Sequence, residues 1–206
     1  VPIMDGSSKD FLDVLQKTDL VNQIKKRKYL KIFDKIELVD GKRKISIEPN
    51  KQSLEVDFQL DYESKIIGKQ KNVVDFQKNN LEEVSSSRTF CLFEDIEKIK
   101  KFGLAKGGSL DNAVVVDKDK VLNKEGLRND KEFVNHKILD LAGDFMLSGH
   151  RILGKVICFQ GGHELTNLFL RKIFKTFTSF KLIESSDYVV SKKIQSKEFE
   201  KIAVNA

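Results

Sequence analysis

Cysteine, proline and histidine are scarce in this sequence, and the signals of several protein classes are missing. Only two of its 206 residues are cysteine and only two are proline. Cys91 and Cys158 form an unpatterned pair, which suits reduced thiols in a cytosolic protein. No apolar run is long enough to span a bilayer, and the first residues lack the basic start and apolar stretch of a secretory signal. We therefore expect a cytoplasmic protein without a transmembrane segment.

Familiar motifs for nucleotide binding and nucleophilic catalysis are also missing. There is no P-loop, no dinucleotide fingerprint and no Gly-x-Ser-x-Gly elbow, and neither cysteine has a nearby base to activate its thiol. The net charge of +6 would suit an anionic partner, but 37 basic residues are interleaved with 31 acidic ones. The densest basic cluster, at 25–28, precedes a predicted strand and has no nucleic-acid motif beside it. We expect no nucleic-acid partner.

The spacing of apolar residues predicts strands early in the chain and helices later. A hairpin is predicted around Asp40-Gly41, and residues 54–62 alternate apolar and polar side chains, as a strand with one buried face does. Further strands are predicted at 73–76, 113–116 and 151–160. Helices are predicted at 8–22, capped by Ser7, and at 81–84, 93–102, 131–147 and 164–177. This order predicts an α+β fold, a two-layer sandwich of a mainly antiparallel sheet packed on helices.

Two of the three histidines stand in patterns that suit chemistry. His136 and Asp140 lie four apart on the 131–147 helix, so their side chains share one face and could hold a metal ion. Imidazole and carboxylate both suit Zn²⁺, and a catalytic zinc takes three protein ligands. Taken alone, this spacing more often marks a solvated helix pair. Asp144, one turn further, could orient a histidine or simply face solvent.

The second of these histidines is His163, which follows Gly161-Gly162 between a predicted strand and a helix. Glycines there would let the backbone approach a ligand closely. The alternative is a helix-start histidine without a role. His150 lies in a loop, where a structural or surface role is the simpler interpretation.

Together these residues resemble the UDP-3-O-acyl-N-acetylglucosamine deacetylase family. Residues 133–144 fill every fixed position of its His-Lys-x-x-Asp-x-x-Gly-Asp motif, and Ser87-Arg88-Thr89-Phe90 resembles its Arg-Thr-Phe motif. The segments 107–109, 121–128 and 162–163 follow in the family's order. Residues 1–7 resemble the segment that closes the family's first domain.

The resemblance implies an activity and several residue roles. It implies zinc-dependent hydrolysis of the acetamide of UDP-3-O-acyl-N-acetylglucosamine in lipid A biosynthesis. His136 and Asp140 would be zinc ligands, although Fe²⁺ suits the same donors. His163 would be the general acid, hydrogen-bonded to Asp144. Thr89 would help to hold the oxyanion of the tetrahedral intermediate. Lys137 would contact the nucleotide sugar near its phosphates, and Tyr62 would stack on the uracil.

The resemblance also implies a βαβ insert at about 90–117 that lines a passage for the acyl chain. Ordinary core packing is the alternative for any single residue of the insert. The candidate lining residues are Phe93, Ile96, Leu110, Ala113 and Val115, and Phe90 and Gly108 are further candidates for substrate binding.

One family feature is missing from the sequence. The family's third zinc ligand and its glutamate base form a Glu-His pair in the first domain, and no such pair occurs here. We therefore expect residues 1–24 to be the end of that domain, with its last helix, 27–184 the C-terminal deacetylase domain, and 185–206 a loosely held tail. The chain alone is expected to be nearly inactive without the N-terminal domain. The alternative is a non-catalytic fragment that binds the nucleotide sugar and acyl chain.

Overall fold

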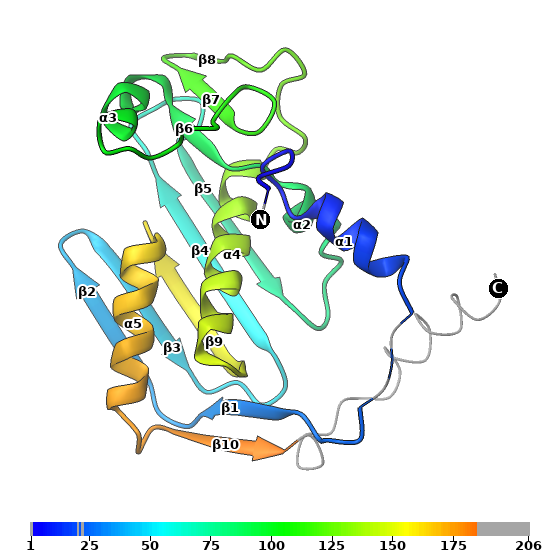
Figure 1. Ribbon diagram of the computed structural model, residues 1–206. Helices are drawn as coiled ribbons and strands as arrows, with labels where there is room; N and C mark the ends of the chain where they lie inside the picture. The colour runs from blue at the N-terminus through cyan, green and yellow to red at the C-terminus, as the bar shows by residue number, and fades with distance from the viewer. Residues whose placement is uncertain (1, 20, 22, 185–206) are drawn as a thin grey trace.

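The computed structural model describes residues 2–19, 21 and 23–184, so the predicted tail at 185–206 lies outside the described residues. The predicted α+β fold is confirmed. A seven-stranded, mainly antiparallel sheet carries helices α4 (Glu132–Phe145) and α5 (His163–Lys175) across one face (Figure 1). No helix among the described residues is long and apolar enough to cross a membrane.

Strand β9 (Arg151–Phe159) is the centre of the sheet. It runs parallel to β4 (Leu54–Asp61), which pairs with β5 (Lys69–Asp75). β9 also pairs antiparallel with β3 (Arg43–Glu48), which continues to β2 (Ile36–Asp40), and parallel with β1 (Lys28–Ile32), which continues to β10 (Phe180–Glu184). In the strand order β1 and β3 flank β9. The chain leaves the end of β9 directly into α5, which places the start of that helix beside α4.

The core lies between the sheet and the two helices. The predicted alternation in β4 is confirmed, because Val56, Phe58 and Leu60 are buried. Full burial of such a side chain contributes about 1.5–3 kcal/mol. The apolar stripes of α4 and α5 face these strands, and their buried members are Phe133, Val134, Ile138, Leu141 and Phe145 on α4, and Leu165, Phe169, Leu170 and Ile173 on α5.

The predicted insert forms a second, three-stranded sheet at the end of the molecule near the start of α4 (Figure 1). Strand β6 (Phe90–Leu92) and β7 (Val114–Asp117) are parallel and are joined through the 3-10 turn η1 (Phe93–Asp95) and α3 (Ile96–Lys101). This is the expected βαβ unit. It extends past the predicted end at 117, because β8 (Lys120–Val121) pairs with β7.

The first helix is shorter than predicted. Helix α1 covers Lys9–Gln16 rather than 8–22, and Ser8, not Ser7, precedes it. The hydroxyl of Thr18 donates to the carbonyl of Leu15 at 2.7 Å, a local bond of the kind that competes with helix continuation. The N–H and hydroxyl of Ser8 both donate to the carbonyl of Ser85 at 3.0 Å, which ties α1 to the end of α2 (Glu82–Ser86).

Two further strand predictions need correction. Strand β5 begins at Lys69 rather than 73, and β10 was not predicted. Both are edge strands with charged, half-exposed residues, so they lack a clear apolar alternation. These two strands are defined by pairing with a neighbouring strand instead. Lys71 of β5 forms an ion pair with Asp57 of β4 at 2.9 Å, and β10 pairs antiparallel with β1.

The apolar side of α1 is exposed, because no residue of this helix is buried against the described part of the chain. Val14 is 62% exposed and Leu15 58% exposed. We expect this chain to self-associate, because contiguous apolar surface drives association. Size-exclusion chromatography at rising concentration should show earlier elution, and the V14K/L15K variant should elute as a monomer. The matched control Q16K should associate like the parent chain. A parent chain that stays monomeric at all concentrations would contradict this expectation.

Candidate active site

His136 and Asp140 face each other on α4, one helical turn apart. His136 Nε2 lies 3.3 Å from Asp140 Oδ1, and His136 Nδ1 lies 3.0 Å from the carbonyl oxygen of Ser87. A carbonyl oxygen only accepts, so Nδ1 carries a proton and Nε2 is the atom that faces the carboxylate. A nitrogen lone pair and a carboxylate oxygen repel at this distance unless a cation, a proton or a metal ion, lies between them. This donor pair therefore fits a divalent metal.

The electrostatics of Asp140 also suit a metal ligand. Lys137 Nζ lies 3.1 Å from Asp140 Oδ2. Burial by itself raises the pKa of Asp140, but the hydrogen bond and charge of His136 and the nearby Lys137 outweigh burial and hold that pKa well below its usual range. The carboxylate is therefore ionised at neutral pH.

A second His–Asp pair stands next to the first. His163 is the first residue of α5, and its Nδ1 lies 3.0 and 2.9 Å from the two carboxylate oxygens of Asp144. Nδ1–H donates to this carboxylate, which leaves Nε2 directed toward the site, 3.9 Å from Asp140 Oδ2. The His163 side chain is 67% exposed, so Nε2 can exchange a proton with a bound molecule.

The turn that carries His163 requires glycine. A Cβ on Gly161 would lie 2.4 Å from Cys158 Sγ and 3.1 Å from the ring of Phe58. Only glycine allows the chain to leave β9 this close to the core and to deliver His163 to the start of α5. Gly161 therefore approaches the core beneath the site, whereas a Cβ on Gly162 would meet nothing within 4 Å. The expected approach of these glycines to a ligand stays a prediction.

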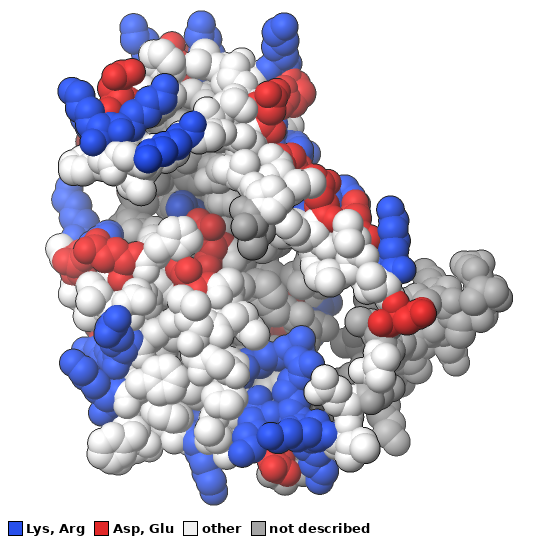
Figure 2. Space-filling model, viewed as in Figure 1, with Lys and Arg blue, Asp and Glu red and all other residues white. Residues whose placement is uncertain are grey.

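An apolar cavity of about 550 Å³ lies in the insert, next to the motif residue Thr89. Helix α3, the loop that follows it, and strands β6 and β7 line the cavity, with Ile3 from the N-terminal segment. The five residues predicted to line an acyl passage lie on its wall, as do two further substrate-binding candidates: Phe93, Ile96, Leu110, Ala113 and Val115, with Phe90 and Gly108. Figure 2 shows the same face of the molecule hollowed between the insert and α5.

Tyr62 lies at a second cavity, whose wall shares Phe93 with the first. Loop 61–65 after β4 and the edges of the insert line a space of about 830 Å³. The Tyr62 ring meets the Phe90 ring edge-on, with centroids 6.0 Å apart, and Lys137 Nζ lies 5.5 Å from the centroid of Phe90. Phe90 therefore stands between the two cavities and beneath the ammonium group of Lys137.

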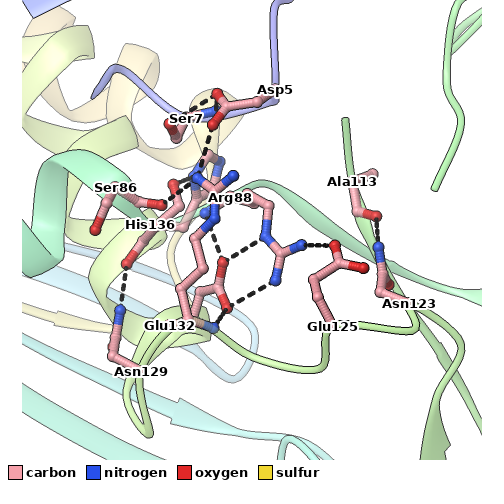
Figure 3. A network of polar contacts seen from close by, with 12 residues as sticks. Asp5, Ser7, Ser86, Arg88, Ala113, Asn123, Glu125, Asn129, Glu132 and His136 are labelled. Carbon is pink, nitrogen blue, oxygen red and sulfur yellow. Dashed lines mark hydrogen bonds and ion pairs between the residues drawn. The ribbon is translucent and has the colours of Figure 1, made fainter. Parts of the chain in front are cut away.

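A buried ion pair next to His136 was missed by sequence reasoning. Arg88 appeared there only as part of a motif, and Glu132 was not considered. The Glu132 carboxylate accepts from Arg88 Nε at 2.8 Å, and their side chains are 0% and 1% exposed (Figure 3). The sequence signal is a glutamate one turn before His136, directly in front of the apolar Phe133.

Among residues 2–19, 21 and 23–184, no group of three or more His, Cys, Asp or Glu side chains is placed to hold a metal.

Two adjoining His–Asp pairs beside an apolar cavity define an acid–base site suited to an amphiphilic ligand. A family model described as LpxC, UDP-3-O-acyl N-acetylglycosamine deacetylase, matches residues 1–175, and the chain belongs to this family. It is 40% identical, over 91% of its length, to the UDP-3-O-acyl-N-acetylglucosamine deacetylase of Syntrophotalea carbinolica. It is 41% identical over 85% to that of Pseudoalteromonas translucida, and 36% identical over 91% to that of Helicobacter pylori. These matches cover 60%, 59% and 63% of the relatives, so the chain spans about three fifths of their length.

Proposed function

We propose that this chain contributes the C-terminal part of a cytoplasmic, metal-dependent deacetylase that hydrolyses the acetamide of UDP-3-O-acyl-N-acetylglucosamine in lipid A biosynthesis. The observation that carries the proposal is the contact between the two His–Asp pairs, in which His163 Nε2 lies 3.9 Å from Asp140 Oδ2. The names of the relatives support the substrate. One pair suits a metal and the other suits proton transfer, and hydrolysis of an unactivated amide needs both.

His136 and Asp140 would hold the metal, Zn²⁺ or Fe²⁺, through Nε2 and a carboxylate oxygen. When bound, zinc polarises a carbonyl and lowers the pKa of a coordinated water to about 7. The chain prepares both donors. The Ser87 carbonyl keeps a proton on Nδ1 of His136, and the depressed pKa of Asp140 keeps its carboxylate ionised.

His163 would protonate the amine as it leaves. The ring is 67% exposed, and Asp144 fixes it through Nδ1. Thr89, at the start of the insert, would donate to the oxygen on which negative charge develops at the acetamide carbonyl. His163 would thus deliver the proton, and Thr89 would stabilise the developing negative charge.

The substrate would extend across both cavities. A volume of about 550 Å³ is within the usual range for a ligand pocket, and an apolar wall suits an acyl chain. The cavity beside Tyr62 would take the uridine, with the ring stacked on the base. Lys137, whose Nζ lies over Phe90, would meet the phosphates.

We propose further that the site needs an N-terminal domain. His136 and Asp140 are two donors, whereas catalytic zinc sites take three protein ligands. The second candidate function is a non-catalytic module that binds the nucleotide sugar and acyl chain. It is favoured by one observation, that both cavities are formed by the described residues alone.

Acetate release from UDP-3-O-acyl-N-acetylglucosamine tests the proposal. The chain would be assayed alone and mixed with the separately produced N-terminal region of the Syntrophotalea carbinolica relative. Activity is expected only in the mixture, and D140A should abolish it. Binding of the UDP-sugar without turnover in the mixture would favour the non-catalytic module. Absence of both would contradict the proposed function.

Metal removal should abolish the activity of this mixture. We expect a chelator to reduce acetate release to background and stoichiometric Zn²⁺ to restore it, since His136 and Asp140 cannot activate water by themselves. Circular dichroism of the chain should stay unchanged, because the core does not depend on the metal. Turnover that persists after complete metal removal would overturn the metal-dependent part of the proposal.

A further inference from the structure

One peptide group is held at both ends by side chains of α4. The carbonyl oxygen of the Ser87–Arg88 peptide accepts from His136 Nδ1 at 3.0 Å. The N–H of the same peptide donates to Glu132 Oε1 at 3.0 Å. Glu132 and His136 lie four residues apart on one face of α4, so a single helical turn holds the peptide from both sides.

The Glu132 carboxylate is itself held tightly. Besides the Arg88 backbone, it accepts from Arg88 Nε at 2.8 Å and Nη2 at 3.2 Å, and from the backbone N–H of Arg128 at 2.6 Å. The guanidinium of Arg88 also donates to the carbonyl of Gly126 at 2.7 Å and contacts Glu125. The carboxylate therefore has little freedom to move away from the peptide.

The same cluster reaches the N-terminal segment. Arg128 Nη1 lies 2.7 Å from Asp5 Oδ2 and donates to the carbonyl of Ser86 at 2.9 Å. The hydroxyl of Ser87 donates to the carbonyl of Glu83 at 2.6 Å. These contacts restrain the residues on either side of the clamped peptide.

We propose that Glu132 is a positioning residue for His136. By holding the Ser87–Arg88 peptide, it aims the Ser87 carbonyl at Nδ1 and so determines which ring nitrogen of His136 carries the proton. Nε2 is then the nitrogen available to a metal. The inference rests on the proposed function only in treating His136 as a ligand. The orientation of the ring is a property of the chain itself. Loss of the hydrogen bond that orients a metal-ligating histidine typically weakens metal affinity by about 10–100-fold.

The ring proton of His136 provides a direct test at one fixed pH. With ¹⁵N-labelled histidine, only three residues contribute ring signals, and H136Q identifies those of His136. The wild-type chain should show a slowly exchanging Nδ1–H proton. In E132Q, where an amide replaces one carboxylate oxygen, this proton should exchange at least tenfold faster or disappear. E125Q is the matched control: it also removes a carboxylate from Arg88 but does not touch the peptide, and its signal should match wild type.

A merely structural role for Glu132 would leave the ring signal unchanged in folded E132Q, and that result would overturn the proposal. So would the absence of the slowly exchanging proton in the wild-type chain. Unchanged His150 and His163 signals show that a variant is folded. If E132Q does not fold, E132D decides by the same measurement, because it keeps the charge beside Arg88 but withdraws the carboxylate from the peptide N–H.

Metal affinity supplies a second readout. In the mixture with the N-terminal region, E132Q should bind Zn²⁺ about 10–100-fold more weakly than E125Q. Equal affinities would count against the proposal. If the mixture binds no zinc at all, the proposed function fails, while the ring signal still decides the role of Glu132.

Discussion

H163A in the reconstituted mixture should lower kcat for acetate release by about 10²–10⁴-fold, the usual contribution of a positioned general acid. The Michaelis constant should change little, because His163 does not line either cavity. The physical reason is the geometry of the ring: Nδ1 is fixed by Asp144 and Nε2 is free to deliver a proton. Steady-state kinetics with the UDP-sugar substrate measures the effect.

Two further variants test whether the effect is specific to His163. D144N should reduce kcat less than H163A, because it leaves the imidazole in place but removes the carboxylate that orients it. H150Q is the matched histidine control, since His150 precedes β9 and His163 follows it, at the opposite end of the strand. Its kinetics should equal those of the parent chain. A fall in kcat under about threefold for H163A would remove the general acid from the mechanism, given the expected range.

The largest stability effect is expected from R88L. This change leaves the Glu132 carboxylate buried without its guanidinium partner, and breaking a buried pair in this way costs about 3–5 kcal/mol. Such a loss is a large fraction of the roughly 5–15 kcal/mol that stabilises a typical domain. Urea unfolding followed by circular dichroism measures it as a lower midpoint at unchanged slope.

The control for R88L uses the other acidic partner of the same guanidinium. Glu125 is 58% exposed, so E125Q should lower the free energy of unfolding far less than R88L does. The double variant R88L/E132Q should recover part of the loss, because no uncompensated charge then remains buried. If R88L and E125Q had equal effects, burial would not be what makes this pair important.

Much of the fold follows from local pattern. The alternation at 54–62, the Asp40-Gly41 hairpin and the helix at 131–147 were predictable, because each is specified by residues close together in the chain. Helix α1 is the counterexample: the apolar spacing in the sequence extends to Leu20, yet a local hydrogen bond from Thr18 accompanies the end of the helix at Gln16. The edge strands β5 and β10 needed their partners, since pairing rather than alternation defines them.

Part of the candidate site was likewise predictable from the sequence, and part required the tertiary structure. The sequence by itself determined that His136 and Asp140 share a helix face, because the helical period is a local property. The βαβ unit at 90–117 was implied by the family resemblance. Only the tertiary structure decided that His163 meets Asp144, nineteen residues earlier in the chain, and that Glu132 holds a peptide forty-four residues away. Those contacts depend on how β9 places α5 beside α4 and how α4 packs against the segment before β6. Such packing is set by the whole core, which no short stretch of sequence specifies.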